Sequence, residues 1–272
     1  MPGRVLQEIT QPEAAALLDR SGLVVIPCGS IEQHGPHLPF GTDTYAAESV
    51  AVRLADELDA LVATIGPLGV TPFHMSFAGT VTVRPTTFVA LLEDVCDSLI
   101  RHGARRFVFV NWHEGNQSAI GQAAASLQVQ HAGQGVRFVV VQAMWIAHEL
   151  FGQEVGLTHG GEIEALAVLA DHPELAHLER ATNPGPSGPA AELDGLRRRK
   201  GAYPILADIR EITPTGWYGT VAGATPDRAK EMAEQTAARA AAYVREAFTV
   251  IERAAEWAHP AGSMGVHGAA RP

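Results

Sequence analysis

Apolar residues along the chain fall into short continuous runs and longer stretches with helical spacing. The short runs predict strands buried on both faces, at residues 23–27, 61–65, 106–111 and 136–142. In the longer stretches apolar residues recur every three or four positions, which predicts helices over residues 43–60, 86–102, 116–131, 162–171 and 225–257. Strands that alternate with helices indicate an α/β fold with a mostly parallel central sheet covered by helices.

One stretch interrupts this alternation. Residues 181–205 are rich in Pro and Gly and contain an Arg run, which predicts an excursion or lid within the domain. The chain shows no internal repeat. We therefore expect one domain over residues 1–258 and a flexible C-terminal tail over residues 259–272.

Composition narrows the possible partners. The 272 residues include 20 basic and 30 acidic side chains, a formal net charge of −10, which argues against nucleic-acid or membrane-surface binding. No apolar run is long enough to span a bilayer, no secretory leader opens the chain, and two cysteines cannot form a disulfide framework. We expect a cytoplasmic protein whose partner is a small-molecule substrate.

Twelve histidines are a high number for this length, and several stand beside carboxylates where a predicted strand ends. Ligands in an open parallel sheet bind beyond the carboxyl ends of the strands, so these residues are candidates for a site. Carboxylates and imidazoles without thiolates suit Zn, Mn or Fe, and five such groups suit two ions better than one. The predicted metal ligands are Glu32, His34, Asp43, His113 and Glu164.

Several of these candidates also have an ordinary structural explanation. Asp43 suits a helix N-terminus, His113 suits a polar strand end, and a His-x-x-His pair such as His34 and His37 is a weak signal alone. Glu164 is harder to explain in this way, because it interrupts an apolar helix and a buried carboxylate needs a partner.

Three segments resemble motifs of the creatininase (creatinine amidohydrolase) family. PCGSIEQHGPHLPFGTDT, at residues 27–44, is similar to the family signature and has its spacing of Glu, His and Asp. NWHEGN at residues 111–116 and HGGEIEA at residues 159–165 resemble two further family motifs. The likeness covers about residues 20–245 and includes FAGT at residues 77–80 and GWYG at residues 216–219.

The resemblance implies a three-layer α/β/α sandwich with a dinuclear metal centre, in a homo-oligomer that is often a hexamer. It implies that Glu32 and His113 bind one divalent ion, His34 and Glu164 the other, and that Asp43 bridges them. His159 corresponds to a histidine implicated in proton transfer during ring opening.

The sequence departs from creatininase itself around the substrate. Glu114 replaces a tyrosine and Gly115 a glutamate, while Val155 and Gly156 replace a tryptophan and an aspartate. Glu114 is a second catalytic candidate: it could order His113, replace a ligand or contact a cationic part of the substrate, or be an ordinary solvated loop residue. The candidate substrate-binding residues are Trp145, His74, Trp112 and His37.

These features together predict a metal-dependent amidohydrolase that cleaves a carbon–nitrogen bond other than a peptide bond, in a cyclic or small amide other than creatinine. The alternatives are the same centre acting on a lactone, formamide or peptide bond, and a non-catalytic binding or assembly subunit. A nucleotide-binding protein is not supported, because the glycine-rich turns lack phosphate-cradling spacing.

Overall fold

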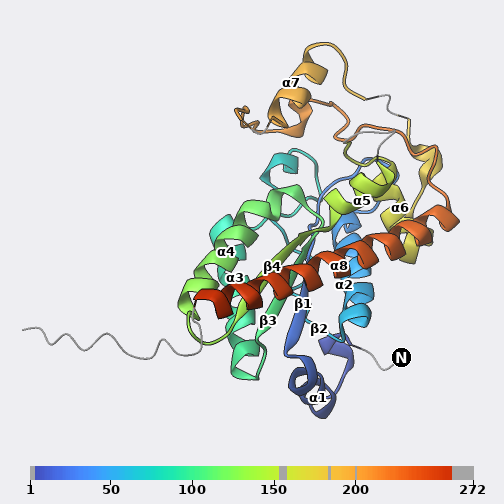
Figure 1. Ribbon diagram of the computed structural model, residues 1–272. Helices are drawn as coiled ribbons and strands as arrows, with labels where there is room; N and C mark the ends of the chain where they lie inside the picture. The colour runs from blue at the N-terminus through green and yellow to red at the C-terminus, as the bar shows by residue number, and fades with distance from the viewer. Residues whose placement is uncertain (1–3, 153–157, 183–184, 200, 259–272) are drawn as a thin grey trace, which may run out of the picture.

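A four-stranded parallel sheet forms the centre of the molecule (Figure 1). The computed structural model describes residues 4–152, 158–182, 185–199 and 201–258. The strand order is β2-β1-β3-β4, and every neighbouring pair is parallel. The strands are β1 (Leu23–Cys28), β2 (Leu61–Val62), β3 (Arg106–Asn111) and β4 (Arg137–Gln142).

Helices cover both faces of this sheet. The longer ones are α1 (Gln11–Ser21), α2 (Thr42–Leu58), α3 (Pro85–Arg101), α4 (Gln117–Gln130) and α8 (Pro226–Ala258). The shorter ones are α5 (Ala143–Phe151), α6 (Glu162–Asp171) and α7 (Pro189–Arg197). One core cluster joins the sheet to α2, α5, α6 and α8, and a second joins its other face to α1, α3 and α4. The three-layer sandwich is therefore confirmed.

Alternation within the strands decides which side chain enters which core. In β1, Val25 belongs to the cluster under α2 and α8, whereas Val24 and Ile26 belong to the cluster under α3 and α4. Successive side chains of a strand point to opposite faces, so a strand covered on both sides must be apolar throughout. This is why the strands read as unbroken apolar runs.

The predicted elements match the structure with a few differences. The second strand is shorter than the predicted residues 61–65, since it ends at Val62. The start of the predicted helix 116–131 is a 3-10 turn, Glu114–Asn116, that leads into α4. Helices α1 and α5 were not predicted.

The predicted excursion at residues 181–205 contains α7, which stands beyond the carboxyl edge of the sheet in Figure 1. The single-domain organisation stays a prediction, and the predicted tail at 259–272 lies outside the described residues. No helix among the described residues is long and apolar enough to cross a membrane.

Helix α2 offers a matched test of the core. Val50 is 2% exposed and packs in the cluster between sheet and helices, whereas Val52 on the same helix is 37% exposed. We expect Val50→Ala to lower the free energy of unfolding by about 2 kcal/mol, from lost burial and a residual cavity. Val52→Ala should change it by less than about 0.5 kcal/mol. Urea unfolding measures both, and equal losses would contradict this assignment of the buried face.

Candidate metal centre

The pairing of β1 with β3 brings two of the predicted motifs together. Cys28, the last residue of β1, lies opposite Asn111, the last residue of β3, in parallel register. The segments that follow both strands therefore leave from the same edge of the sheet. The first carries Glu32 and His34, and the second carries His113. All three side chains are buried.

Two helix N-termini supply the other carboxylates. Asp43 lies in the first turn of α2 and Glu164 in the first turn of α6, where the helix dipole favours a negative charge. The Glu164 carboxylate accepts a hydrogen bond from the Gly160 backbone N–H, and Asp43 accepts one from the Ser30 hydroxyl at 2.8 Å. Both carboxylates are thus fixed before any ion binds.

Asp43 lies between the two predicted ligand histidines. Its Oδ1 is 3.3 Å from His34 Nε2, and its Oδ2 is 3.0 Å from His113 Nδ1. Glu32 Oε2 is 3.5 Å from His113 Nδ1, and Glu164 Oε1 is 3.6 Å from His34 Nε2. The five predicted ligands therefore form one cluster, with Asp43 at its centre.

The backbone orients both imidazoles for ligation. His34 Nδ1 lies 3.1 Å from the Glu32 carbonyl oxygen, and His113 Nε2 lies 3.0 Å from the Val70 carbonyl oxygen. A carbonyl only accepts, so these nitrogens carry the protons and the opposite ring nitrogens face the carboxylates. His34 Nε2 is buried without a hydrogen-bond partner. A ring nitrogen directed at carboxylates suits a cation, which is a proton in the ion-free protein and a metal ion once one binds, and such carbonyl contacts are typical of metal-binding histidines.

Electrostatics favour positive charge in the cluster. Burial and the Glu32 carboxylate oppose ionisation of Asp43, but His34 and His113 outweigh them and lower the pKa of Asp43 to about 2. Burial would lower the pKa of His34, yet Asp43 and Glu164 raise it well above its usual value. Three buried carboxylates that share only imidazoles as partners of opposite charge need added positive charge.

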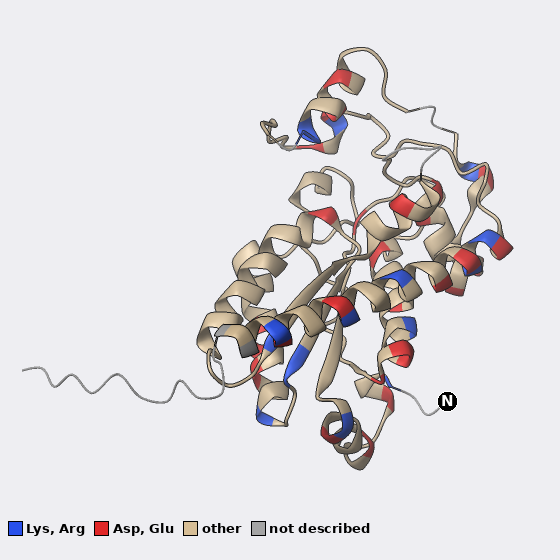
Figure 2. Ribbon diagram, in the orientation of Figure 1, with Lys and Arg blue, Asp and Glu red and all other residues tan. Residues whose placement is uncertain are grey.

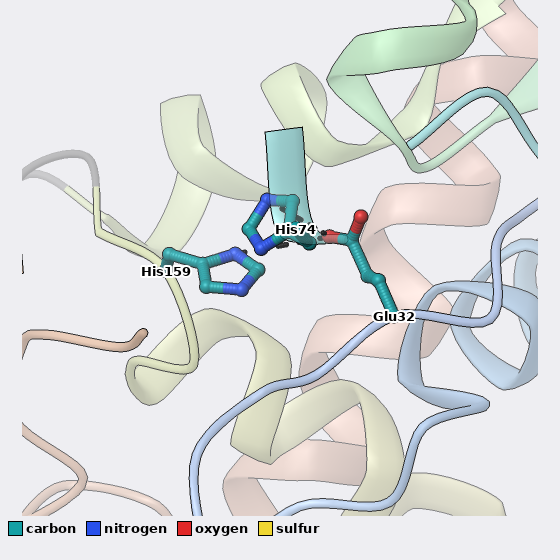
Figure 3. Close-up of side chains that lie close together, drawn as sticks. All are labelled: Glu32, His74 and His159. Atoms are coloured by element: carbon teal, nitrogen blue, oxygen red, sulfur yellow. Dashed lines mark ion pairs between the residues drawn. The ribbon is translucent and has the colours of Figure 1, made fainter. Parts of the chain in front are cut away.

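Two further histidines adjoin these ligands, as Figure 3 shows. His74 Nε2 is 3.7 Å and His159 Nδ1 is 3.9 Å from Glu32 Oε1. The ring centroids of His74 and His159 are 4.4 Å apart. Within the described part of the chain, three groups of side chains could each hold an ion: Glu32, Asp43 and His113; His34, His159 and Glu164; and Glu32, His74 and His159.

Gln33, which the sequence analysis did not single out, orients this histidine pair. His159 Nε2 lies 2.8 Å from the Gln33 carbonyl oxygen and therefore donates to it. The Gln33 amide nitrogen lies 2.9 Å from His74 Nδ1 and 2.5 Å from the Gly216 carbonyl oxygen. Its two protons satisfy these two acceptors, which leaves His159 Nδ1 and the His74 Nε2–H facing Glu32. The position of Gln33 inside the motif between Glu32 and His34 is the signal that could have revealed it.

A cavity of about 290 Å³ opens onto these groups. It is lined by predicted site residues and by side chains that the sequence analysis did not select. The predicted ones are Glu32, His74, Trp112, His113, Glu114, His159 and Glu164. The others include Thr71, Phe73, Met144, His148, Arg197, Arg198 and Ile209. The Arg run in the excursion is the sequence signal that could have revealed Arg197 and Arg198 as residues of the cavity. Its interruption of the strand and helix pattern predicted only an excursion.

Two predicted substrate-binding residues lie elsewhere. Trp145 is 37% exposed and is absent from the lining of this cavity. His37 packs against Trp217 with ring centroids 4.4 Å apart, and its Nε2 donates to the Gly160 carbonyl at 2.7 Å. His37 therefore supports the turn before Glu164, and its contact with substrate stays a prediction, as does that of Trp145. Val155 and Gly156 lie outside the described residues.

Glu114 lies at the cavity wall, apart from the ligand cluster. Its side chain is 49% exposed, and its Oε2 is 3.5 Å from Arg197 Nη1. It belongs to none of the three groups that could hold an ion. The neighbouring position 115 requires glycine, because a Cβ on Gly115 would overlap the Val70 carbonyl and the His113 ring.

The comparisons with known proteins agree with this geometry. The family model described as creatinine amidohydrolase matches residues 7–244. The chain belongs to the creatininase family. It is 30% identical over 230 residues to the mycofactocin precursor peptide peptidase of Mycobacterium ulcerans, covering 81% of this chain and 84% of that protein. It is 29% identical over 182 residues to the creatinine amidohydrolase of Pseudomonas putida, covering 61% and 70%.

Solved creatininases share the fold. A manganese form superposes with a TM-score of 0.71 at 22% identity, over 90% of this chain and 99% of that one. A Zn–Zn form of a variant gives 0.70 at 22% identity, over 91% and 99%. The predictions of a creatininase-like fold and of a hydrolase acting on carbon–nitrogen bonds are confirmed. None of these comparisons supports the alternative of a non-catalytic subunit.

Asn116 provides a test of how the site is held. This fully buried side chain accepts from the Val70 N–H at 2.8 Å and donates to the Gly29 carbonyl at 2.8 Å. Asn116→Ala leaves both backbone groups without their partner, so we expect the free energy of unfolding to fall by about 2 to 4 kcal/mol. Gln117→Ala, at an exposed neighbour, is the control in the same denaturant titration. A loss below about 1 kcal/mol for Asn116→Ala would contradict this structural role.

Proposed function

We propose that this member of the creatininase family is a metal-dependent amidohydrolase with two divalent ions, which cleaves a carbon–nitrogen bond in a small or cyclic amide. The observation that carries the proposal is the position of Asp43, whose two oxygens face two different histidines. A carboxylate in this position can bridge two ions, with Glu32 and His113 on one side and His34 and Glu164 on the other.

Charge and ligand type support two ions. Glu32, Asp43 and Glu164 carry three negative charges in a buried cluster, and two divalent ions carry four positive charges. Carboxylate and imidazole ligands accept Zn, Mn or Fe. When bound, such ions would supply an activated water as nucleophile and a Lewis acid for the substrate carbonyl.

The chain's own residues would then handle protons and orientation. The His159 ring carries its proton on Nε2, so Nδ1, at the cavity edge beside Glu32, is placed to accept a proton from the attacking water and then pass it to the departing nitrogen. His74, whose Nε2–H faces the same carboxylate, can donate a hydrogen bond to a substrate oxygen. Trp112 and Phe73 line the cavity and exclude water from this region.

Cavity size favours a small substrate. A volume of about 290 Å³ is at the lower end of the range for ligand sites. A peptide bond remains the second candidate, because a curated relative is a peptide peptidase. A peptide substrate would fit only if its terminal residue alone entered this cavity. A lactone or formamide would use the same centre. We further propose that the chain forms a homo-oligomer such as a hexamer, as the family resemblance implies.

The first test is metal content. The protein purified without chelator should hold close to two divalent ions per chain by elemental analysis, and chelation should abolish hydrolysis of an amide panel. Asp43→Asn should cost both ions, because it weakens the group that bridges them. Asp19→Asn, at an exposed helix position, is the matched control. Unchanged metal content in Asp43→Asn would exclude a bridging role.

His159→Asn tests the proton role separately. The substitution removes Nδ1 as a proton carrier, so the turnover number should fall by about 10²- to 10⁴-fold. Metal content should stay near that of the unmodified protein if His159 is no ligand. Loss of one ion in this variant would instead assign His159 to the metal site.

A further inference from the structure

The wall of the cavity contains two arginines from the excursion. Arg197 and Arg198, at the end of α7, line the same cavity as Glu32, His113 and Glu164. Each arginine side chain is only 17% exposed. Figure 1 shows α7 beyond the carboxyl edge of the sheet, and Figure 2 shows basic and acidic residues side by side on it. A segment far from the ligands in sequence thus adds positive charge to the site.

A buried carboxylate holds both guanidinium groups. Asp194, which is 9% exposed, accepts from Arg197 Nε at 2.8 Å and from Arg198 Nε at 3.2 Å. The Tyr218 hydroxyl donates to Asp194 at 3.0 Å and accepts from Arg198 Nη2 at 2.5 Å. Contacts through Nε fix the plane of each guanidinium, as required for binding a planar anion.

The charges in this wall do not cancel. Two guanidiniums opposed by the Asp194 carboxylate leave one positive charge in a largely buried position. In the described part of the chain, Arg197 also pairs with Glu114, whose side chain is 49% exposed and whose Oε2 lies 3.5 Å from Arg197 Nη1, longer than an ordinary hydrogen bond. Because the Glu114 carboxylate is half exposed to water, it offsets the remaining charge of Arg197 only in part. A buried charge without a full partner is costly unless a ligand supplies the partner.

We propose that Arg197 and Arg198 bind a carboxylate group of the substrate, so that this enzyme acts on amides that carry one negative charge. The proposal rests on the proposed function and names its substrate class. The Arg197 guanidinium carbon lies 5.7 Å from the centroid of the Phe73 ring, which keeps the group at the cavity wall. One surplus positive charge matches a monoanionic carboxylate better than a doubly charged phosphate.

The same geometry weighs against a cationic substrate. Glu114 was a candidate for contacting a positive group, yet Arg197 lies beside it and would repel such a group. With about 290 Å³ available, the carboxylate and the scissile bond must belong to one small molecule or to the C-terminal residue of a peptide.

Binding of a matched pair of probes tests the proposal. N-acetylglycine carries the carboxylate, and N-acetylglycinamide has nearly the same shape without the charge. Calorimetry on the metal-loaded protein should show tighter binding of the acid. Arg197→Gln should weaken binding of the acid by about tenfold or more and leave the neutral amide unchanged. Arg199→Gln is the control, since Arg199 is exposed and does not line the cavity.

Two more variants separate this role from folding and from metal binding. Glu114→Gln removes the acid beside Arg197, so it should tighten binding of N-acetylglycine, whereas a cation-binding Glu114 predicts no such gain. Arg197→Lys keeps the charge but loses the planar fork, so its affinity for the acid should lie between those of the unmodified protein and Arg197→Gln. Arg197→Gln should keep its metal content and stay folded at the temperature of the titration, because Arg198 and Tyr218 still bind Asp194.

The experiment distinguishes failure of the carboxylate assignment from failure of the proposed function. Equal binding of acid and amide by the unmodified protein, or equal loss of both probes in Arg197→Gln, would overturn the carboxylate assignment and leave the metal-dependent mechanism intact. Acid binding that is tight but unaffected by Arg197→Gln would place the carboxylate on the metal ions alone, and would also overturn it. Absence of divalent metal from the purified chain would instead overturn the proposed function.

Discussion

The parallel pairing of β1 with β3 is the constraint on which the site depends. Because Cys28 and Asn111 end their strands side by side, the segments carrying Glu32 and His113 must start from one edge. The fully buried Asn116 then joins the segment after β3 to the backbone of two other segments. A shift of this register would separate ligands that come from different parts of the chain, whatever their local conformation.

The buried charge of the three carboxylates explains why several elements of the fold contribute hydrogen-bond donors to the cluster. Three buried carboxylates are unfavourable unless something compensates them. Helix N-termini help at Asp43 and Glu164, and hydroxyl or backbone donors bind Asp43, Glu32 and Glu164. The Gln33 amide adds a fixed histidine pair beside them. The cluster is thus preorganised at some cost in stability, as expected for a site that binds cations.

The cavity has two parts of different origin. Its base is the candidate ligand cluster at the strand ends, and its wall includes Arg197 and Arg198 from the excursion that carries α7. The base accounts for bond cleavage in the proposed mechanism, and the wall for the choice of substrate. Relatives named as a mycofactocin precursor peptide peptidase and as a creatinine amidohydrolase fit this division, since loops outside the sheet can change without disturbing the sheet edge.

Much of the fold, and the residues that gather in the candidate cluster, could be predicted from the sequence alone. Unbroken apolar runs identify strands covered on both faces, and the motif around Glu32, His34 and Asp43 is local enough to be read directly. The position of the Asp43 oxygens between His34 and His113, the pairing of Gln33 with His74, and the entry of Arg197 into the cavity were decided by tertiary structure. Those contacts join segments far apart in the chain, and no local pattern encodes such distances.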